Sequence, residues 1–529
     1  MGRLSAKTRV SISAALACLL LVPVLRLCAA DEGAPASTVY YVDNSHADAT
    51  DFLNAHGSAD RPRVSLPSGR IPAGSRVEVR GGPYESDDTL LIEAEGTADA
   101  PVVVTGAAAG DLPIIRVPIE ITGSHIVIEH LAFDRNRRTL DVVPGATNVT
   151  IRHNRFTGQP VDDGYTSVIG IYGDESAATH DIVISDNVMQ LFGDRSPDSD
   201  ENDYHGIKAS QYCTDVSILR NTIFAMAGDS VQIGDARMAE EARCRRIHIA
   251  RNTFFFNREN AIDIKKSSDV LISQNVLYGF REPESDEAIA VVIHDAADGV
   301  WIAENWIADS SLGVINTAGT DVWLIANFVT GMHPQYSDSM TDFYGDGVAA
   351  HFRGDSSGGA LFNVFSDYAR GIQVASGGPY VMAGNLFRRS DEYRGYDLMV
   401  QSTRLIDAIS LTANDFADFR ARISSENHRS PGRLQSRGGA WSADDAANTL
   451  VEFFCRNQAE AVRDVLRGRL DPALAADYRD RFGEDILRET APTADGDGLF
   501  AIFASVASDP AVPDALIDSI GGSAASFCE

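Results

Sequence analysis

The sequence predicts an all-β protein, a right-handed parallel β-helix (a solenoid) with a small α-helical C-terminal region, and three observations lead to that expectation. From about residue 123 onward one short phrase recurs: a turn, alternating aliphatic residues, an Asn, and further apolar residues. The alternation has a period of two, which is typical of strands and excludes a helical repeat. The Asn returns with a minimum spacing near 22 residues, so each copy is one coil of constant size that carries loops of different length.

The fixed Asn is the strongest of these signals. Stacked Asn side chains can hydrogen-bond one another and satisfy turn backbone groups that would otherwise be buried without partners. A β-sandwich with similar strands is the alternative, but it gives no reason for an Asn at one place. The Asn positions are 154, 187, 221, 252, 275, 305, 327, 363 and 385, and an early copy has Leu131 in that place.

The chain divides into five expected parts. Arg3, Lys7 and Arg9 precede an apolar run that ends near Leu25, and small residues follow, which is typical of a secretory signal and predicts a secreted or periplasmic protein. After residue 442 apolar residues follow helical spacing. The expected parts are a signal peptide (1–30), an N-terminal cap with opening coils (31–122), β-helix repeats (123–400), a capping or linker segment (401–441) and a helical C-terminal region (442–529).

The amino-acid composition and the net charge argue against several protein classes and several kinds of binding partner. With 44% hydrophobic and 23% charged residues, the chain does not fit the disordered, collagen-like or coiled-coil classes. Its net charge of -30 argues against nucleic acid or an anionic membrane as a partner through the bulk field. No stretch after the signal is long and apolar enough to span a bilayer. We also expect the protein to be a monomer.

Four cysteines remain outside the signal. Cys213 and Cys244 each stand eight residues before a repeat Asn, so they occupy the same place on successive coils, about 4.8 Å apart. That separation suits a disulfide, and in an exported protein we expect one, which leaves Cys455 and Cys528 to pair with each other. Two buried free thiols are the alternative.

Chemistry in a β-helix must lie on an outward face, because the interior is packed. Each coil has a second strand between the repeat phrases, such as HGIKAS (205–210), DSVQIG (229–234) and NAIDIK (260–265). When the alternation of these strands is aligned, three coils place polar residues on one side. These are His205, Lys208, Asp229, Asp263, Lys265 and Lys266, of which Lys208, Asp229 and Asp263 are candidates for substrate binding. A Lys beside acids can have its pKa tuned and act as a base.

From about residue 38 to 400 the chain resembles the pectate-lyase-like superfamily of right-handed parallel β-helix proteins. The phrase IDIKKSSDVLISQN (262–275) is similar to the Asn-Lys-Ser coil of the family that holds alginate lyases and chondroitinase B. In that family a Lys nine residues before the ladder Asn is the Brønsted base, which implies Lys266 here, with Lys265 beside it. The family's calcium acids precede this Lys, which implies Glu259 as a ligand, although Ala261 stands where another acid is expected.

The sequence also departs from that family. The next coil of the family supplies a catalytic Arg, whereas VIHDAAD (292–298) offers only His294, and Arg281 is the nearest arginine. The resemblance implies a lyase that cleaves an acidic, uronate-containing polysaccharide by β-elimination, with His294, His205 or Arg281 as proton donor and possible calcium. Two alternatives stay open. One is a glycosidase or epimerase that uses paired carboxylates such as Asp229 and Asp263, and the other is a non-catalytic glycan-binding or cell-surface element.

Overall fold

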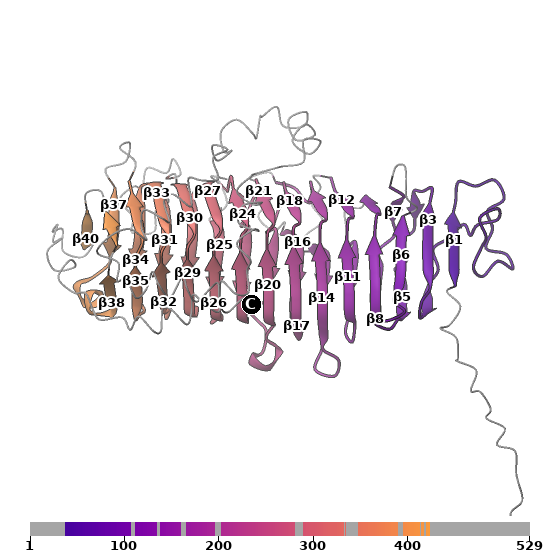
Figure 1. The fold of residues 1–529 in the computed structure, drawn as a ribbon, viewed down its shortest axis with the longest axis horizontal. Coiled ribbons are helices and arrows are strands. Elements are labelled where there is room, and N and C mark those ends of the chain that lie inside the picture. Colours follow the sequence, from indigo (N-terminus) through magenta and orange to yellow (C-terminus); the bar gives the residue numbers. More distant parts are fainter. Residues whose placement is uncertain are drawn as a thin grey trace, which may run out of the picture. The chain divides into compact units, whose positions relative to one another are not determined.

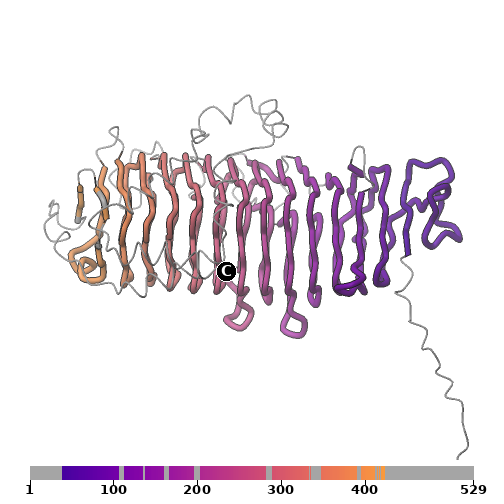
Figure 2. Tube along the Cα trace, in the orientation of Figure 1, coloured from indigo at the N-terminus to yellow at the C-terminus, as the bar shows by residue number. Residues whose placement is uncertain are grey.

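The computed structural model describes residues 38–423, except for 107–111, 135–137, 160–165, 196–202, 281–288, 333, 335–346, 390–394, 413 and 417–418. In this part of the chain the strands pair in parallel from coil to coil, and each strand bonds to the corresponding strands before and after it. Figures 1 and 2 show the coils stacked along one axis from β1 to β40. The expected right-handed parallel β-helix is confirmed.

Each coil has three strands, which form three parallel ladders. The first ladder runs through β2 (Gly69–Pro72), β5 (Leu90–Glu95), β8 (Ile119–Glu129), β10 (Leu140–Val142), β13 (Thr166–Ile171), β16 (Tyr204–Ala209), β19 (Val231–Ile233), β22 (Ile262–Lys265), β25 (Ile289–His294), β28 (Leu312–Asn316), β31 (Val348–Phe352), β34 (Arg370–Val374), β37 (Tyr396–Val400) and β40 (Ala421–Ile423). The second runs through β1 (Val39–Asp43), β3 (Arg76–Arg80), β6 (Val102–Gly106), β8 again, β11 (Thr147–Arg152), β14 (Thr179–Ser185), β17 (Cys213–Leu219), β20 (Arg245–Ala250), β23 (Ser268–Ser273), β26 (Asp298–Ala303), β29 (Thr320–Ile325), β32 (Gly358–Leu361), β35 (Tyr380–Ala383) and β38 (Ile409–Thr412).

The third ladder is a separate sheet of short strands. It runs through β4 (Tyr84–Glu85), β7 (Ile114–Arg116), β9 (Ala132–Asp134), β12 (Arg155–Thr157), β15 (Val188–Gln190), β18 (Thr222–Phe224), β21 (Thr253–Phe255), β24 (Val276–Tyr278), β27 (Trp306–Ser310), β30 (Phe328–Met332), β33 (Val364–Tyr368), β36 (Leu386–Arg388) and β39 (Asp415–Phe416). Two short 3-10 turns, Glu240–Ala242 and Thr403–Ala408, complete the described elements.

The Asn of each coil lies between the second and third strands, and the expected ladder forms. Asn221 donates from both its main-chain N–H and its Nδ2 to Oδ1 of Asn252, at 2.8 and 3.1 Å. Asn252 in turn donates in the same two ways to Asn275. The ladder reaches from the main-chain N–H of Leu131 to Asn414, so even the coil without an Asn uses its neighbour's side chain.

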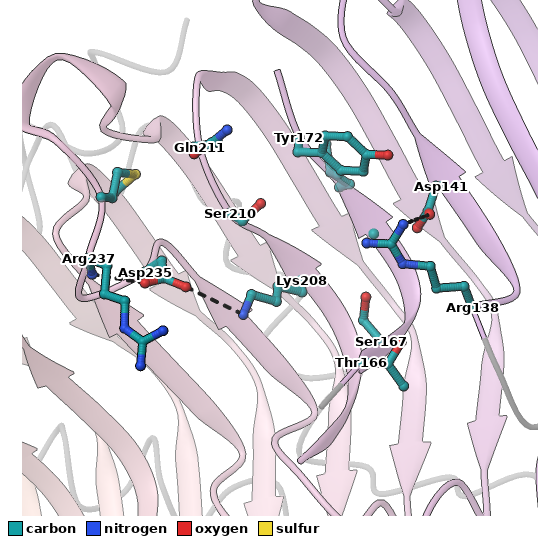
Figure 3. Close-up of a pocket in the computed structure, with 13 residues that line it drawn as sticks. Arg138, Asp141, Thr166, Ser167, Tyr172, Lys208, Ser210, Gln211, Asp235 and Arg237 are labelled. Atoms are coloured by element: carbon teal, nitrogen blue, oxygen red, sulfur yellow. Dashed lines mark hydrogen bonds and ion pairs between the residues drawn. The ribbon is translucent and has the colours of Figure 1, made fainter. Parts of the chain in front are cut away.

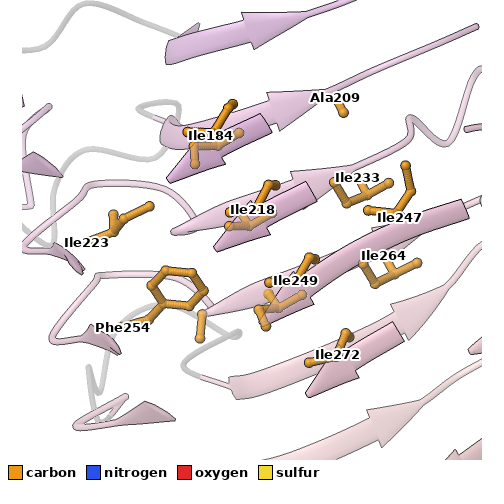
Figure 4. Packing of buried hydrophobic residues seen from close by; sticks show 14 of the residues in the cluster. Ile184, Ala209, Ile218, Ile223, Ile233, Ile247, Ile249, Phe254, Ile264 and Ile272 are labelled. Atoms are coloured by element: carbon orange, nitrogen blue, oxygen red, sulfur yellow. The ribbon is translucent and has the colours of Figure 1, made fainter. Parts of the chain in front are cut away.

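Stacked aliphatic side chains fill the interior. Ile184, Ile218, Ile249 and Ile272 occupy one column on successive coils, each directly over the next, and all four are fully buried. Figure 4 shows this column beside the Ile residues of the first ladder. Since equivalent positions repeat along the stack, these four Ile side chains pack on copies of themselves, and this part of the interior is closely packed.

The predicted Cys213–Cys244 disulfide is wrong, although its register is right. Thr214 pairs with Arg245, so the two cysteines do lie on adjacent coils at the same position. Both are nevertheless buried free thiols. Each Sγ lies against a carbonyl, that of Cys213 at 3.1 Å from Gln211 O and that of Cys244 at 3.6 Å from Ala209 O. The hydrogen bond between the two thiols and their burial raise the pKa of Cys213, which keeps it protonated.

Several expectations fall outside the described residues. These are the signal peptide, the helical C-terminal region, most of the capping segment and the pairing of Cys455 with Cys528. In the described part of the chain, no helix combines the length and apolar character that a membrane crossing requires.

Candidate functional site

The outward face of the first ladder carries a polar column. Lys208 pairs with Gln232, and Gln232 pairs with Asp263, which confirms the alignment expected from the sequence. The column continues in the other direction through Gly170 on β13 to Asp141 on β10. Five successive coils therefore present Asp141, Gly170, Lys208, Gln232 and Asp263 in one line.

A cavity of about 500 Å³ opens over this column, centred on Lys208 (Figure 3). Gly170 forms part of its floor because it has no side chain: a Cβ there would lie 2.4 Å from Oδ1 of Asp141. The lining residues are Arg138, Asp141, Thr166, Ser167, Gly170, Ile171, Tyr172, Lys208, Ser210, Gln211, Asp235, Arg237 and Met238. The cavity thus gathers three cationic side chains, two carboxylates and a phenol, a set able to bind and polarise an acidic ligand.

Among the cationic side chains of the cavity, Lys208 has the pKa that its surroundings shift most. Its side chain is only 11% exposed, and Nζ lies 3.9 Å from Oδ2 of Asp235. Burial, helped by the positive charge of Lys265, outweighs the attraction of Asp235 and lowers the pKa of Lys208 to about 8. An amine with such a pKa is partly neutral near physiological pH and can accept a proton.

The opposite wall holds an acid, an arginine and a tyrosine (Figure 3). Arg138 lies 3.3 Å from Oδ2 of the buried Asp141. Burial raises the pKa of Asp141 despite that arginine. Burial and the nearby charge of Asp141 also raise the pKa of Tyr172, so its phenol stays protonated and can donate a proton.

Arg237 completes the cavity on the Lys208 side. It is exposed, and its guanidinium forms no ion pair with a carboxylate of the described residues. Its main-chain N–H donates to Oδ1 of Asp235 at 2.9 Å, which holds the turn in place. A guanidinium in this position can bind a carboxylate of a ligand in bidentate fashion.

Three of the expected site residues lie together, Asp263 and Lys265 two coils away from Lys208 and His294 on the coil after them. Asp263 is fully buried and is held between Lys265 Nζ at 2.9 Å and His294 Nε2 at 2.6 Å. Burial disfavours ionisation of Asp263, but the hydrogen bond and charge of His294, with those of Lys265, lower its pKa. Burial also disfavours protonation of His294, and the same contact with Asp263 overcomes it and raises the pKa of His294. The carboxylate of Asp263 thus pairs with both Lys265 and His294, so that none of the three side chains is an unengaged base.

Lys266, the base implied by the resemblance, points elsewhere. It occupies the turn after β22 with a left-handed φ of 40°, and Nζ donates to the main-chain carbonyl of Met238 at 2.8 Å. Met238 lines the cavity. Lys266 therefore hydrogen-bonds to the main chain of a residue in the cavity wall, and its ammonium group is engaged in that contact.

The side chains of His205 and Asp229 are buried and are not exposed to solvent on the outer face. Each is 1% exposed, and Nδ1 of His205 accepts the main-chain N–H of Asp229 at 3.1 Å. The strand alternation breaks at this corner, because Gly206 packs against the core residue Ile223 while Ile207 also faces the core. The simple inward–outward alternation therefore does not hold for His205.

A cluster of three potential metal ligands forms at this corner. Ligand atoms of His205, Asp229 and Glu259 all lie within 4.8 Å of one another. Asn260 donates to Oδ1 of Asp229 from both its main-chain N–H and its Nδ2, at 3.1 and 3.0 Å. Glu259, the expected calcium ligand, thus lies beside a second carboxylate. Arg281 lies outside the described residues.

Of the residues that line the cavity, the sequence analysis predicted only Lys208, and it missed the other charged side chains and the phenol, namely Arg138, Asp141, Tyr172, Asp235 and Arg237. One signal was present: LDV (140–142) and VIGIY (168–172) occupy the second-strand place of the two preceding coils. Extending the Lys208 column backward through these strands leads to Asp141.

Solved structures similar to this chain include enzymes whose names refer to carbohydrates. A mannuronan C-5 epimerase A-module from Azotobacter vinelandii is 16% identical, with 61% of this chain and 91% of that chain covered and a TM-score of 0.36. An alginate lyase, solved in complex with G6, is 12% identical over 73% of this chain and 86% of that one, with a TM-score of 0.45. A GH136 lacto-N-biosidase from Eubacterium ramulus is 13% identical over 73% and 68%, with a TM-score of 0.38.

The chain is a right-handed parallel β-helix protein. The parallel pairing of the strands from coil to coil carries that statement. No family model and no curated protein matches the sequence.

Proposed function

We propose that this protein acts on an acidic polysaccharide by removing the C5 proton of a uronate and expelling the C4 oxygen, a β-elimination in which Lys208 is the base. The observation that carries the proposal is the buried Lys208 ammonium, whose pKa is lowered to about 8 inside a cavity lined by arginines and a protonated tyrosine. A base of this pKa is about one-tenth neutral at pH 7, which suits proton abstraction at physiological pH.

Each step has a group in the cavity to perform it. Neutral Lys208 takes the C5 proton, the C4–C5 double bond forms, and the C4–O bond breaks. Tyr172 donates its phenolic proton to the leaving oxygen. Arg237, with Arg138 on the opposite wall, neutralises the uronate carboxylate so that charge can develop on it in the transition state. These local cations also offset the net charge of -30, which would otherwise repel a polyanion.

The expected calcium remains part of the proposal. Asp229 and Glu259 offer carboxylate oxygens, the donors that calcium prefers, and His205 adds a nitrogen that suits zinc or manganese better. A divalent cation held there would supply positive charge beside the cavity. Omission and return of calcium, zinc or manganese after chelation tests this site separately from Lys208.

Hydrolysis is the second candidate, and one observation favours it. Burial raises the pKa of Asp141, which favours its protonated form relative to an exposed carboxyl, and Asp235 supplies a second carboxylate across the cavity. Such a pair is what a glycosidase uses as acid and base. The pair Asp229 and Asp263 is less suited, because both carboxylates are buried and hydrogen-bonded to neighbouring coils. Binding without turnover is the outcome left if neither reaction is seen.

The test is ultraviolet absorbance from unsaturated uronate ends. The protein is mixed with alginate, pectate and glycosaminoglycans, with divalent cations and with a chelator. We expect absorbance to rise with at least one polymer and to be lost in Lys208→Ala, while Asp141→Asn retains activity. New reducing ends without absorbance, lost in Asp141→Asn, would instead establish hydrolysis. Export to the periplasm or medium, and action as a monomer, are proposed with it and are checked by cell fractionation and sedimentation.

A further inference from the structure

Two tryptophans point outward from the second ladder. Trp301 on β26 is in register with Trp323 on β29, the next strand of that ladder. The residues before and after Trp301, Val300 and Ile302, are fully buried, whereas Trp301 and Trp323 are both partly exposed. Figure 1 shows β26 and β29 next to one another in the stack. We call Trp301 and Trp323 the tryptophan pair.

The third tryptophan of the described residues shows how an indole is buried in this fold. Trp306, on β27 of the third ladder, is only 6% exposed and packs against Tyr278, with the ring centroids 6.1 Å apart. The tryptophan pair instead presents two indoles on the outer face, one on each of two adjacent strands, which are about 4.8 Å apart. That spacing is close to the length of one sugar ring, so successive units of a glycan chain can lie on the two indoles.

A carboxylate holds the indole of Trp323 in place. Nε1 of Trp323 donates to Oδ1 of Asp321 at 2.6 Å. The main-chain N–H of Asp321 in turn donates to Oγ of Ser357 at 3.1 Å. The ring is therefore oriented before a ligand arrives, which reduces the conformational entropy lost on binding.

A gap opens beside Trp301, because the residue two positions earlier is Gly299. Of the described residues beyond its own segment, the nearest atom to a Cβ added at Gly299 is the main-chain N of Asp269, at 3.7 Å, followed by its Oδ1 at 3.8 Å. Asp269 and Asp321 occupy the same place on the coils to either side, and both are exposed. The gap thus has a carboxylate on each side that can accept hydrogen bonds from hydroxyl groups.

The charges around the tryptophan pair determine the class of ligand. Asp269, Asp298 and Asp321 are exposed carboxylates on these coils, and the protein as a whole has a net charge of -30. They repel a polyuronate, which distinguishes this surface from the cavity over Lys208 on the first ladder. An uncharged sugar suits it, because its apolar C–H face packs on an indole and its hydroxyls donate to carboxylates.

We propose that Trp301, Trp323 and the gap at Gly299 form a binding surface for a neutral polysaccharide. Two sugar rings stack on the two indoles, and their hydroxyls donate to Asp269 and Asp321. The surface attaches the protein to a neutral glycan and leaves the cavity on the first ladder unoccupied by that glycan. This inference does not rest on the proposed enzymatic function.

Native gel electrophoresis in gels that contain a soluble polysaccharide tests the proposal on the full chain. Galactomannan, xyloglucan and mixed-linkage β-glucan are the neutral probes, and alginate is the anionic probe. We expect at least one neutral probe to retard the protein. Lys208→Ala should be retarded by that probe as strongly as the unsubstituted protein, so failure of the proposed β-elimination leaves this test intact.

Substitutions identify the surface. Trp301→Ala and Trp323→Ala should each weaken binding of the neutral probe at least fivefold, whereas Trp323→Phe keeps an aromatic ring and should retain part of it. Gly299→Asn fills the gap with a residue that tolerates the left-handed φ of 63° and should also weaken binding. Val183→Ala, on the same outward column nearer the N-terminus, is the matched control and should bind like the unsubstituted protein. Circular dichroism shows whether each variant folds.

Three results would overturn the proposal. The first is that no neutral probe retards the protein, or that retardation is unchanged in both tryptophan variants. The second is retardation by alginate alone that is lost in Trp301→Ala and Trp323→Ala, which would assign the tryptophan pair to a polyanion. The third is a dimer in sedimentation that Trp323→Ala dissociates, which would assign the pair to a second copy of the chain.

Discussion

The ammonium group of Lys266 donates a 2.8 Å hydrogen bond to the carbonyl of Met238, a residue that lines the cavity over Lys208. This contact separates two lysines that the sequence places on the same face. Lys266 is hydrogen-bonded to the main chain of the cavity wall, whereas Lys208 itself lines the cavity. The account of the site depends on that difference.

Substitution of the two lysines should therefore have different effects. We expect Lys208→Ala to lower kcat at least a hundredfold, because it removes the base. Lys266→Ala should raise KM a few-fold with little change in kcat, because it only loosens the wall at Met238. Steady-state kinetics on the most active polymer give the comparison, with circular dichroism to show that both variants fold. A loss of kcat in Lys266→Ala alone would return the role of base to Lys266.

The pH dependence of turnover should follow Lys208. Its pKa is lowered to about 8, so the neutral fraction grows roughly tenfold per pH unit below that value. We expect kcat to rise from pH 6 to 8 and then level off, while the raised pKa of Tyr172 keeps the proton donor in its acid form. A profile that is flat or falls across this range would exclude an amine base of this pKa.

Removing one Asn from the ladder should destabilise several coils. In Asn252→Ala, the main-chain N–H and the Nδ2 of Asn221 both lose the Oδ1 that accepts their hydrogen bonds. The hydrogen bond from Nδ2 of Asn252 to Ile218 O is also lost. A buried donor without an acceptor costs about 1–3 kcal/mol, so we expect a loss of about 3 kcal/mol in the free energy of unfolding. Urea denaturation measures it. Asn414→Ala, at the half-buried end of the ladder, is the matched control and should cost about 1 kcal/mol.

Glu304 should make stability fall as pH rises. Burial raises its pKa from 4.5 to about 7 against the hydrogen bond from Gln274, so the folded state binds this proton more tightly than the unfolded state. The favourable contribution is complete below pH 4.5 and is lost as pH rises through about 7, amounting to about 3 kcal/mol. Glu304→Gln should remove this part of the pH dependence in urea titrations at pH 5 and 8. Glu95→Gln, at an exposed position, should leave it unchanged; equal slopes in both variants would exclude Glu304 as the cause.

The sequence predicted the stack because its signals are local. The Asn ladder and the column of Lys208, Gln232 and Asp263 follow from repeat spacing and from alternation, which act within one strand and its neighbour. The third strand of each coil is often only three residues long, too short for a clear alternation. The sequence analysis therefore did not predict the third strand separately but included it in the repeat phrase that precedes it.

The site was less predictable, because the conformation of turns and of the bends between strands determines where its side chains point. The left-handed φ of Lys266 directs that side chain to Met238, and the corner at Gly206 and Ile207 breaks the alternation on which the placement of His205 depended. Whether adjacent cysteines form a disulfide also depends on where their side chains point, and Cys213 points toward Gln211 O. Spacing along the chain carries none of this information.

The central claim is that Lys208 removes the C5 proton of a uronate. Proton NMR of the susceptible polymer in deuterated water tests it most directly, because it follows that hydrogen whether the chain is then cleaved or reprotonated. The account predicts that the protein removes the C5 hydrogen, by exchange with solvent or by formation of the double bond, and that Lys208→Ala leaves it in place. Cleavage with the C5 hydrogen retained, or loss of that hydrogen at an unchanged rate in Lys208→Ala, would contradict the account.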